Sequence, residues 1–309
     1  MPAKFKDYVR NVAHVATQLV LARATFLAKG THISPSVSIL IPVHNRLDLT
    51  RPCLESVFAN TDPSVPFELL LIDDVSADGT AEYLRSLGSR IRVIANRRRG
   101  CFGHNINRAA PQTRGEYLCL LNNDTLVTPG WLTRLLAAAR NDPTIGVVGN
   151  RHLTPGTDLI NHAGMVFDNE RYPIHLHVGR PASFPPALVS REFQCVTGAC
   201  WLVPKTLFLE LGGFDPEFRN SYEDVDFCLR VRAHGRKVFY AADSMIYHYR
   251  AQSPGRLDNE ASNLLHFRSK WEAQIVSDLD DYLVRDNVQP KPTETQAQPH
   301  ARSIAEGDV

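Results

Sequence analysis

Between residues 37 and 121, short runs of apolar residues alternate with amphipathic segments, and this alternation limits the folds open to the chain. Runs that are apolar at nearly every position are typical of strands buried on both faces, as in a parallel sheet covered by helices on each side. We therefore expect an α/β fold, with strands at residues 37–43, 67–72, 91–94 and 117–121 and helices at residues 49–59, 80–87 and 103–110.

The second half of the chain has a less regular pattern. Residues 151–192 are rich in His and Pro and are expected to form loops. Elsewhere the spacing of apolar residues predicts strands at 145–148, 200–203, 237–240 and 245–249 and helices at 131–140, 205–211, 225–234 and 264–283. The sequence thus predicts one α/β domain at 37–285, between an N-terminal segment at 1–36 and a tail at 286–309.

The two ends of the chain differ from this domain. Residues 4–29 have apolar residues at helical spacing and predict an amphipathic helix. Its apolar face could pack on protein, or the helix could lie on a membrane surface, which is favoured by Lys4, Lys6 and Arg10. Both interpretations stay open. The tail is rich in Pro, Gln, Thr and Glu and is expected to be disordered.

Bulk properties exclude several classes of protein. The formal net charge of +1 argues against nucleic acid as a partner. The six cysteines form no Cys-x-x-Cys pair, so neither a zinc site nor a disulfide framework is indicated. We recognise neither a signal peptide nor a run of the roughly twenty apolar residues needed to cross a bilayer. We therefore expect a cytoplasmic protein, at the inner face of the membrane if the N-terminal helix binds there.

Polar side chains follow the expected strands at their carboxyl ends, where ligands of open α/β sheets bind. His44-Asn45-Arg46 follows the first strand, Asp73-Asp74 the second and Asn122-Asn123-Asp124 the fourth. The paired acids could accept hydrogen bonds from a nucleotide base or ribose. Asp124 alone would suffice for Mg²⁺ or Mn²⁺ shared with substrate phosphates, although Asn-Asn-Asp also forms ordinary turns.

A second acidic stretch, Glu223-Asp224-Val225-Asp226, begins an expected helix. Acids in a first helical turn favour the helix dipole, with Ser221 as the cap, and Asp226 and Arg230 are spaced as an ordinary ion pair. Alternatively, one of these carboxylates removes a proton from a substrate. The loop at residues 100–105 lacks the Gly-x-Gly-x-x-Gly pattern, and no Gly-Lys-Ser/Thr sequence occurs, which excludes the standard dehydrogenases and P-loop proteins.

Seven short segments carry a pattern along the chain, at residues 37–45, 73–80, 103–105, 121–125, 196–200, 212–215 and 223–226. Taken together in this order, they resemble the family 2 glycosyltransferases of the GT-A fold, nearest to the rhamnosyltransferase-like, O-antigen and cell-wall glycan branch. The resemblance implies a Rossmann-like, mostly parallel sheet flanked by helices. It also implies a nucleotide-sugar-binding half at 37–127, an acceptor-binding half at 128–250 and a C-terminal helix at 251–285.

The resemblance implies roles for individual residues. A divalent metal, Mn²⁺ or Mg²⁺, would be held by Asp124 with His248. Asn122 replaces the first acid of the family's common Asp-x-Asp, which removes one negative charge from this site. The nucleotide sugar would be bound by the loops after the early strands, through Pro42, His44, Asn45, Asp73, Asp74, Asn105, Asn122 and Asn123.

The resemblance also implies the catalytic groups. Asp224 would be the general base that removes a proton from the acceptor hydroxyl, and Glu223 would orient the acceptor. The acceptor side would include Gly198, Trp201 and Gly213. His175 and His177 alternate as strand residues do and are candidates for the surface or an acceptor loop.

The implied activity is an inverting, metal-assisted transfer from a UDP-, dTDP- or GDP-sugar to a growing polysaccharide or lipid-linked glycan. Two alternatives stay open. One is a non-catalytic module that binds a sugar nucleotide within a glycan assembly complex. Asn122, in place of the first acid of Asp-x-Asp, keeps this alternative open. The other is a nucleotidyltransferase, disfavoured because no Gly-rich, Arg/Lys-bearing loop follows the first strand.

Overall fold

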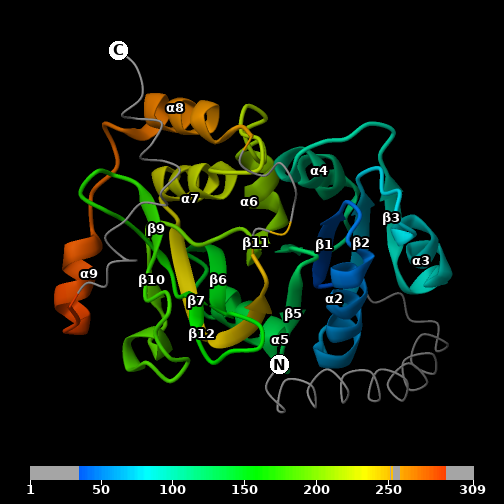
Figure 1. Ribbon diagram of the computed structural model, residues 1–309, viewed down its shortest axis with the longest axis horizontal. Helices are drawn as coiled ribbons and strands as arrows, with labels where there is room; N and C mark the ends of the chain where they lie inside the picture. The colour runs from blue at the N-terminus through cyan, green and yellow to red at the C-terminus, as the bar shows by residue number, and fades with distance from the viewer. Residues whose placement is uncertain (1–34, 251, 253–257, 290–309) are drawn as a thin grey trace.

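The computed structural model describes residues 35–250, 252 and 258–289 (Figure 1). The helix expected at residues 4–29 and the tail from residue 290 lie outside the described residues. An α/β architecture with a central sheet flanked by helices confirms the predicted fold class.

Within the described residues, a ten-stranded sheet runs through the molecule in the order β10-β12-β6-β11-β4-β1-β2-β3. β5 pairs with β12 and β7 with β6 at its margin, whereas β8 and β9 form a separate hairpin. The strands are β1 (Val37–Val43), β2 (Phe67–Asp73), β3 (Arg92–Ala95), β4 (Tyr117–Leu121), β5 (Thr125–Val127), β6 (Ile145–Leu153), β7 (Ile160–His162), β8 (Met165–Phe167), β9 (Pro173–His175), β10 (Arg191–Glu192), β11 (Cys200–Pro204) and β12 (Lys237–His248).

The strands β1 to β4 are parallel to their neighbours in this group, as the sequence predicted. β11 is antiparallel to both β4 and β6 and joins the two halves of the sheet. The carboxyl ends of β1, β2 and β4 therefore lie at the same edge of the sheet, where a ligand crevice is expected.

Helices cover both faces of the sheet. One face packs against α2 (Leu47–Asn60), α3 (Thr80–Ser86) and α5 (Trp131–Asn141). The other face packs against α4 (Phe102–Ala109), α6 (Lys205–Glu210), α7 (Glu223–Ala233), α8 (Glu260–Trp271) and α9 (Leu279–Asp286). Figure 1 shows α6, α7 and α8 gathered on one side of the sheet.

Alternating residues of the central strands serve these two cores. In β1, Ile39 and Ile41 lie in the core of α2 and α5, whereas Leu40 lies in the core of α4 and α7. All three side chains are 0% exposed. Burial on both faces explains why these runs are apolar throughout rather than at every second position.

Three sequence-based expectations need correction. Residues 237–248 form one strand, with a register shift between Ala241 and Met245, rather than two. The stretch at 151–192 contains short strands, β7 to β10. The helix expected at 264–283 is two helices, because Asp278 pairs with Phe167 through both its carboxylate and its backbone N–H and so turns the chain between them.

A buried ion-pair cluster attaches α9 to the stretch before β11. The Asp286 carboxylate accepts hydrogen bonds from Arg191 at 2.6 and 2.7 Å, and it lies 2.8 Å from Nε2 of His177. His177 is 0% exposed, so it belongs to this cluster and not to the surface. Burial opposes ionisation of Asp286, but the hydrogen bonds from Arg191 and His177 outweigh it and hold the pKa of the carboxyl at about 2.

This cluster makes folding stability pH-dependent. Asp286→Asn leaves Arg191 without a charged partner and should lower the free energy of unfolding at pH 7 by about 3 kcal/mol. A carboxyl whose pKa is depressed on folding stabilises fully above its unfolded pKa, and this contribution is lost as the pH falls toward about 2. Urea unfolding at pH 7 and near pH 2 measures the difference. Asp280→Asn on the same helix is the control, with an expected change under about 0.5 kcal/mol. An equal loss for Asp286→Asn at both pH values would contradict this account.

Candidate active site

A pocket of about 300 Å³ opens at the carboxyl ends of β1, β2 and β4. Its floor is formed by the loops that follow these strands, and its far side by the start of α7 and the β8–β9 hairpin. Most of the residues expected to bind the sugar donor, the metal and the acceptor reach it, namely Pro42, His44, Asp74, Asn105, Asn122, Asn123, Asp124, Gly198, Glu223, Asp224 and His248.

One end of the pocket is built around Asp74. Its Oδ1 accepts hydrogen bonds from Nδ2 of Asn96 at 2.7 Å and from the backbone N–H of Gly100 at 2.8 Å. Nδ1 of His44 lies 2.7 Å from the backbone carbonyl of Asp74, so this nitrogen carries the proton and donates it. Asn105 supports the same network by accepting from Asn96 at 2.6 Å. The loops after β1, β2 and β3 are thereby fixed to one another around an acidic group that lines the pocket.

Two residues predicted to contact the sugar donor lie outside the pocket lining. The carbonyl oxygen of the Asn45 side chain accepts from the backbone N–H of Ala77, and the backbone N–H of Asn45 donates to Ser76. Asp73 accepts from the backbone N–H of Ser76 at 3.1 Å. Asn45 and Asp73 therefore shape the loops that carry His44 and Asp74.

The middle of the pocket holds a carboxylate and an imidazole side by side. Oδ1 of Asp124 lies 3.2 Å from Nε2 of His248, and both residues are 8% exposed. Antiparallel pairing of β12 with β5 places His248 opposite Thr125, directly after Asp124, although the two segments are far apart in sequence. The backbone carbonyl of His248 accepts from Asn161 at 2.8 Å, which fixes the end of β12.

This pair has the chemistry of a divalent metal site. Carboxylate oxygen and imidazole nitrogen together suit Mn²⁺ better than Mg²⁺, which prefers oxygen ligands. Within the described part of the chain, no group of three or more His, Cys, Asp or Glu side chains could hold a metal. The remaining ligands would therefore have to include oxygens from a bound substrate or water.

A row of imidazoles continues from His248 behind the pocket. The ring centroids of His248 and His152 are 5.5 Å apart, those of His152 and His162 4.9 Å, and those of His162 and His175 5.0 Å. His175 lines the pocket, and its Nδ1 lies 2.8 Å from that of His162. Burial lowers the pKa of both His152 and His162 well below the ordinary value, so these two rings are neutral at pH 7.

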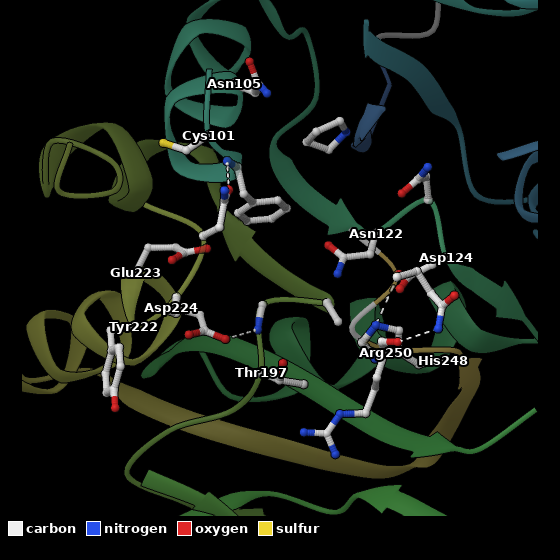
Figure 2. Close-up of a pocket in the computed structure, with 18 of the residues that line it drawn as sticks. Cys101, Asn105, Asn122, Asp124, Thr197, Tyr222, Glu223, Asp224, His248 and Arg250 are labelled. Carbon is white, nitrogen blue, oxygen red and sulfur yellow. Dashed lines mark hydrogen bonds and ion pairs between the residues drawn. The ribbon is translucent and has the colours of Figure 1, made fainter. Parts of the chain in front are cut away.

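Two carboxylates from the start of α7 face this pair across the pocket. Figure 2 shows Glu223 and Asp224 on one side of the pocket and Asp124 and His248 on the other. Oδ2 of Asp224 accepts from the backbone N–H of Gly198 at 2.7 Å. A Cβ on Gly198 would lie 3.0 Å from the Cβ of Asp224, so this close approach favours glycine.

The helix that carries these carboxylates begins without a side-chain cap. The residue before Glu223 is Tyr222, in the left-handed region at φ 67°, and the cap expected from Ser221 is not formed. Helix capping by Ser221 therefore does not explain why Glu223 and Asp224 stand at the start of α7.

Two residues expected on the acceptor side do not reach the pocket. Trp201 is 0% exposed, and its ring stacks on Phe214 with centroids 5.8 Å apart. Gly213 has φ 70° and its backbone carbonyl accepts from Arg230 at 2.7 Å. Trp201 therefore belongs to the core and Gly213 to a turn that packs beneath α7.

Several lining residues carry no motif in the sequence. They come from the β8–β9 hairpin, from the loop after β3, from the segment after β12 and from the start of α8, and include Met165, Tyr172, Arg99, Arg250 and Glu260. These residues reach the pocket through tertiary packing. By contrast, Val43, Thr197 and Ala199 also line the pocket and lie inside the seven segments that the sequence indicated.

Comparison with known proteins identifies the family. The model of glycosyl transferase family 2 matches residues 38–209, more than half of the chain, and the chain belongs to this family. The match ends before α7, so Glu223 and Asp224 lie outside it. The O-antigen biosynthesis protein RfbC of Myxococcus xanthus is 32% identical over 75% of the chain.

Two further proteins agree with this assignment. The N-acetylglucosaminyl-diphospho-decaprenol L-rhamnosyltransferase of Mycobacterium tuberculosis is 26% identical over 67% of the chain and 74% of its own length. The structure of a mannosyltransferase from Pyrobaculum calidifontis in complex with GDP-Man and Mn²⁺ has a TM-score of 0.59 at 16% identity, covering 99% of the chain and 88% of that protein. This structural similarity confirms the predicted GT-A fold.

The chain corresponds to only a part of some relatives. It spans 18% of the Myxococcus xanthus protein and 26% of a related protein of Sinorhizobium fredii. Among the residues that the structure describes, none of the helices has the length and apolar character that crossing a membrane requires.

Proposed function

We propose that this protein transfers a sugar, with inversion, from a nucleotide-diphosphate sugar to a hydroxyl of a growing polysaccharide or lipid-linked glycan. One observation carries the proposal: a carboxylate–imidazole pair and a second pair of carboxylates face each other across one pocket. The first pair suits a metal-bound diphosphate and the second suits a hydroxyl that must lose a proton. The cytoplasmic location expected from the sequence remains part of this proposal.

The nucleotide sugar would enter with its base toward Asp74 and its diphosphate toward Asp124. The Asp74 carboxylate can accept from a base N–H, and Asn122 and Asn123 line the path toward Asp124. Asp124 and His248 would hold a divalent cation, which when bound supplies stabilisation of the negative charge that develops on the departing diphosphate.

The acceptor hydroxyl would be activated by Asp224. The backbone N–H of Gly198 fixes Oδ2 of this carboxylate, so the group is oriented before the substrate arrives. Asp224 removes the proton as the hydroxyl oxygen attacks the anomeric carbon from the face opposite the diphosphate. Glu223, beside it, would hold another group of the acceptor.

The names of the relatives support the classes of substrate. One relative is an O-antigen biosynthesis protein and another an L-rhamnosyltransferase that acts on a diphospho-decaprenol glycolipid. The structural neighbour is bound to GDP-Man and Mn²⁺. We therefore propose a UDP-, dTDP- or GDP-sugar as the substrate and Mn²⁺ as the preferred metal.

Binding and turnover of a panel of these nucleotide sugars test the proposal. Calorimetry with and without Mn²⁺ should show one sugar donor that binds more tightly with the metal. Release of nucleoside diphosphate should then require a glycan acceptor. Binding without release under any of these conditions would favour the non-catalytic module, and no binding to any nucleotide sugar would overturn the proposal.

A further inference from the structure

The helix α8 packs against the side of the pocket that carries Asp224. Phe267 of this helix packs on Tyr222, with ring centroids 5.0 Å apart, and Arg268 lies over the ring of Tyr172, 4.8 Å from its centroid. Both tyrosines line the pocket, as does Glu260 at the start of α8. The family match ends at residue 209 and does not include this helix.

Asn263 of α8 binds both ends of the short loop that precedes the catalytic acids. Its Oδ1 accepts from the backbone N–H of Arg219 at 3.1 Å. Its Nδ2 donates to the backbone carbonyl of Arg219 at 3.0 Å and to Oγ of Ser221 at 2.7 Å. Asn263 is 1% exposed, so these hydrogen bonds are shielded from competing water.

The loop that Asn263 binds has an unfavourable backbone conformation. Asn220 and Tyr222 both have left-handed backbones, at φ 63° and 67°. Such conformations cost about 1 kcal/mol or more each for residues other than glycine, and they persist only where the surrounding contacts impose them. Asn263 supplies such contacts directly before Glu223 and Asp224.

A second attachment fixes the first turn of α7. Asp226 is 0% exposed and accepts from Nε1 of Trp271 at 2.9 Å, and its carboxylate lies 2.5 Å from Nζ of Lys270. Both partners belong to α8. The pair that Asp226 forms with Arg230, at 2.8 Å, was the only one that the sequence indicated.

We propose that Asn263 is a positioning residue for the transfer reaction. It holds the backbone of residues 219–222 so that the carboxylate of Asp224 lies at the acceptor hydroxyl. The contacts of Asp226 with α8 fix the first turn of α7 on the other side of Asp224. Asn263 lies outside the pocket lining and acts on the substrate only through Asp224. This inference rests on the proposed function.

Asn263→Leu keeps the branched shape of the side chain and removes all three hydrogen bonds. We expect kcat to fall about 10- to 100-fold, because small displacements of a catalytic group have effects of this size, while the Kd of the nucleotide sugar stays within about twofold. Asn263→Ser keeps a group that can both donate and accept, introduces no buried charge, and should give an intermediate kcat. This milder variant also provides a test if the leucine variant does not fold.

Leu264→Ala is the matched control. Leu264 is the next residue of α8, is 6% exposed and has no polar atom to bind the loop. Its replacement should lower Tm at least as much as Asn263→Leu without changing kcat. If Asn263→Leu and Leu264→Ala have the same kcat at matched folded fraction, or if the Asn263 variants lose donor affinity and kcat together, Asn263 is only structural. A wild-type protein without transfer activity would instead contradict the proposed function.

Discussion

Replacing Asp224 with asparagine is expected to slow sugar transfer by about 10²- to 10⁴-fold, the usual contribution of a general base. Asparagine has nearly the same shape, and its carbonyl oxygen can still accept the hydrogen bond that Gly198 donates at 2.7 Å. The amide cannot take a proton from the acceptor hydroxyl. The loss should therefore appear in kcat, with the Kd of the nucleotide sugar unchanged.

Glu223→Gln is the matched control for this prediction, because it changes the neighbouring carboxylate in the same helical turn. Its effect should be about 10-fold and mainly on the KM of the acceptor. The substitution weakens a hydrogen bond to a charged group but leaves the proton transfer to Asp224 intact. Steady-state rates and calorimetric donor affinities for both variants measure the difference. Equal kcat values for Asp224→Asn and the wild type would remove Asp224 from the role of base.

Replacing Asp124 with asparagine is expected to reduce turnover on the order of 10³-fold, because charge stabilisation by a bound metal contributes several kcal/mol. The chain offers the metal one carboxylate here, since residue 122 is asparagine. His248→Gln should have a smaller effect, because it removes a neutral ligand. Turnover of each variant is measured as a function of Mn²⁺ concentration, with a chelator-treated sample as the metal-free reference.

The reverse substitution tests the same site from the opposite direction. Asn122→Asp restores the Asp-x-Asp pattern and adds one negative charge to the lining of the pocket. It should therefore lower the Mn²⁺ concentration needed for half-maximal turnover. Full activity in the presence of chelator, or an unchanged Mn²⁺ dependence in Asp124→Asn, would contradict a metal at this position.

The sequence predicted the fold and the loops of the site better than it predicted individual contacts. The rule that ligands bind at the carboxyl ends of parallel strands led to the loops that contain Asp74 and Asp124. The same rule could not separate Asp74, which lines the pocket, from Asp73, which binds Ser76. Whether an acid lines the pocket depends on the direction of its side chain, and the local sequence does not specify that direction.

Other parts of the site depend on contacts between distant segments. His175 reaches the pocket through the β8–β9 hairpin, which the sequence indicated only as loop. Glu260 and Asn263 lie on α8, whose separation from α9 follows from the pairing of Asp278 with Phe167. The expectation for Trp201 was wrong in the other direction. The resemblance assigned it to the acceptor side, directly after a matching segment, but its side chain is fully buried.

The anomeric configuration of the product tests the central claim most directly. Attack by a hydroxyl that Asp224 activates, on the face opposite the diphosphate, inverts the anomeric carbon in a single displacement. Proton NMR of the first product, with a sugar donor of known configuration and Mn²⁺, should therefore show the opposite anomer. A product that retains the configuration of the donor would contradict the assignment of Asp224 as the base in a direct displacement.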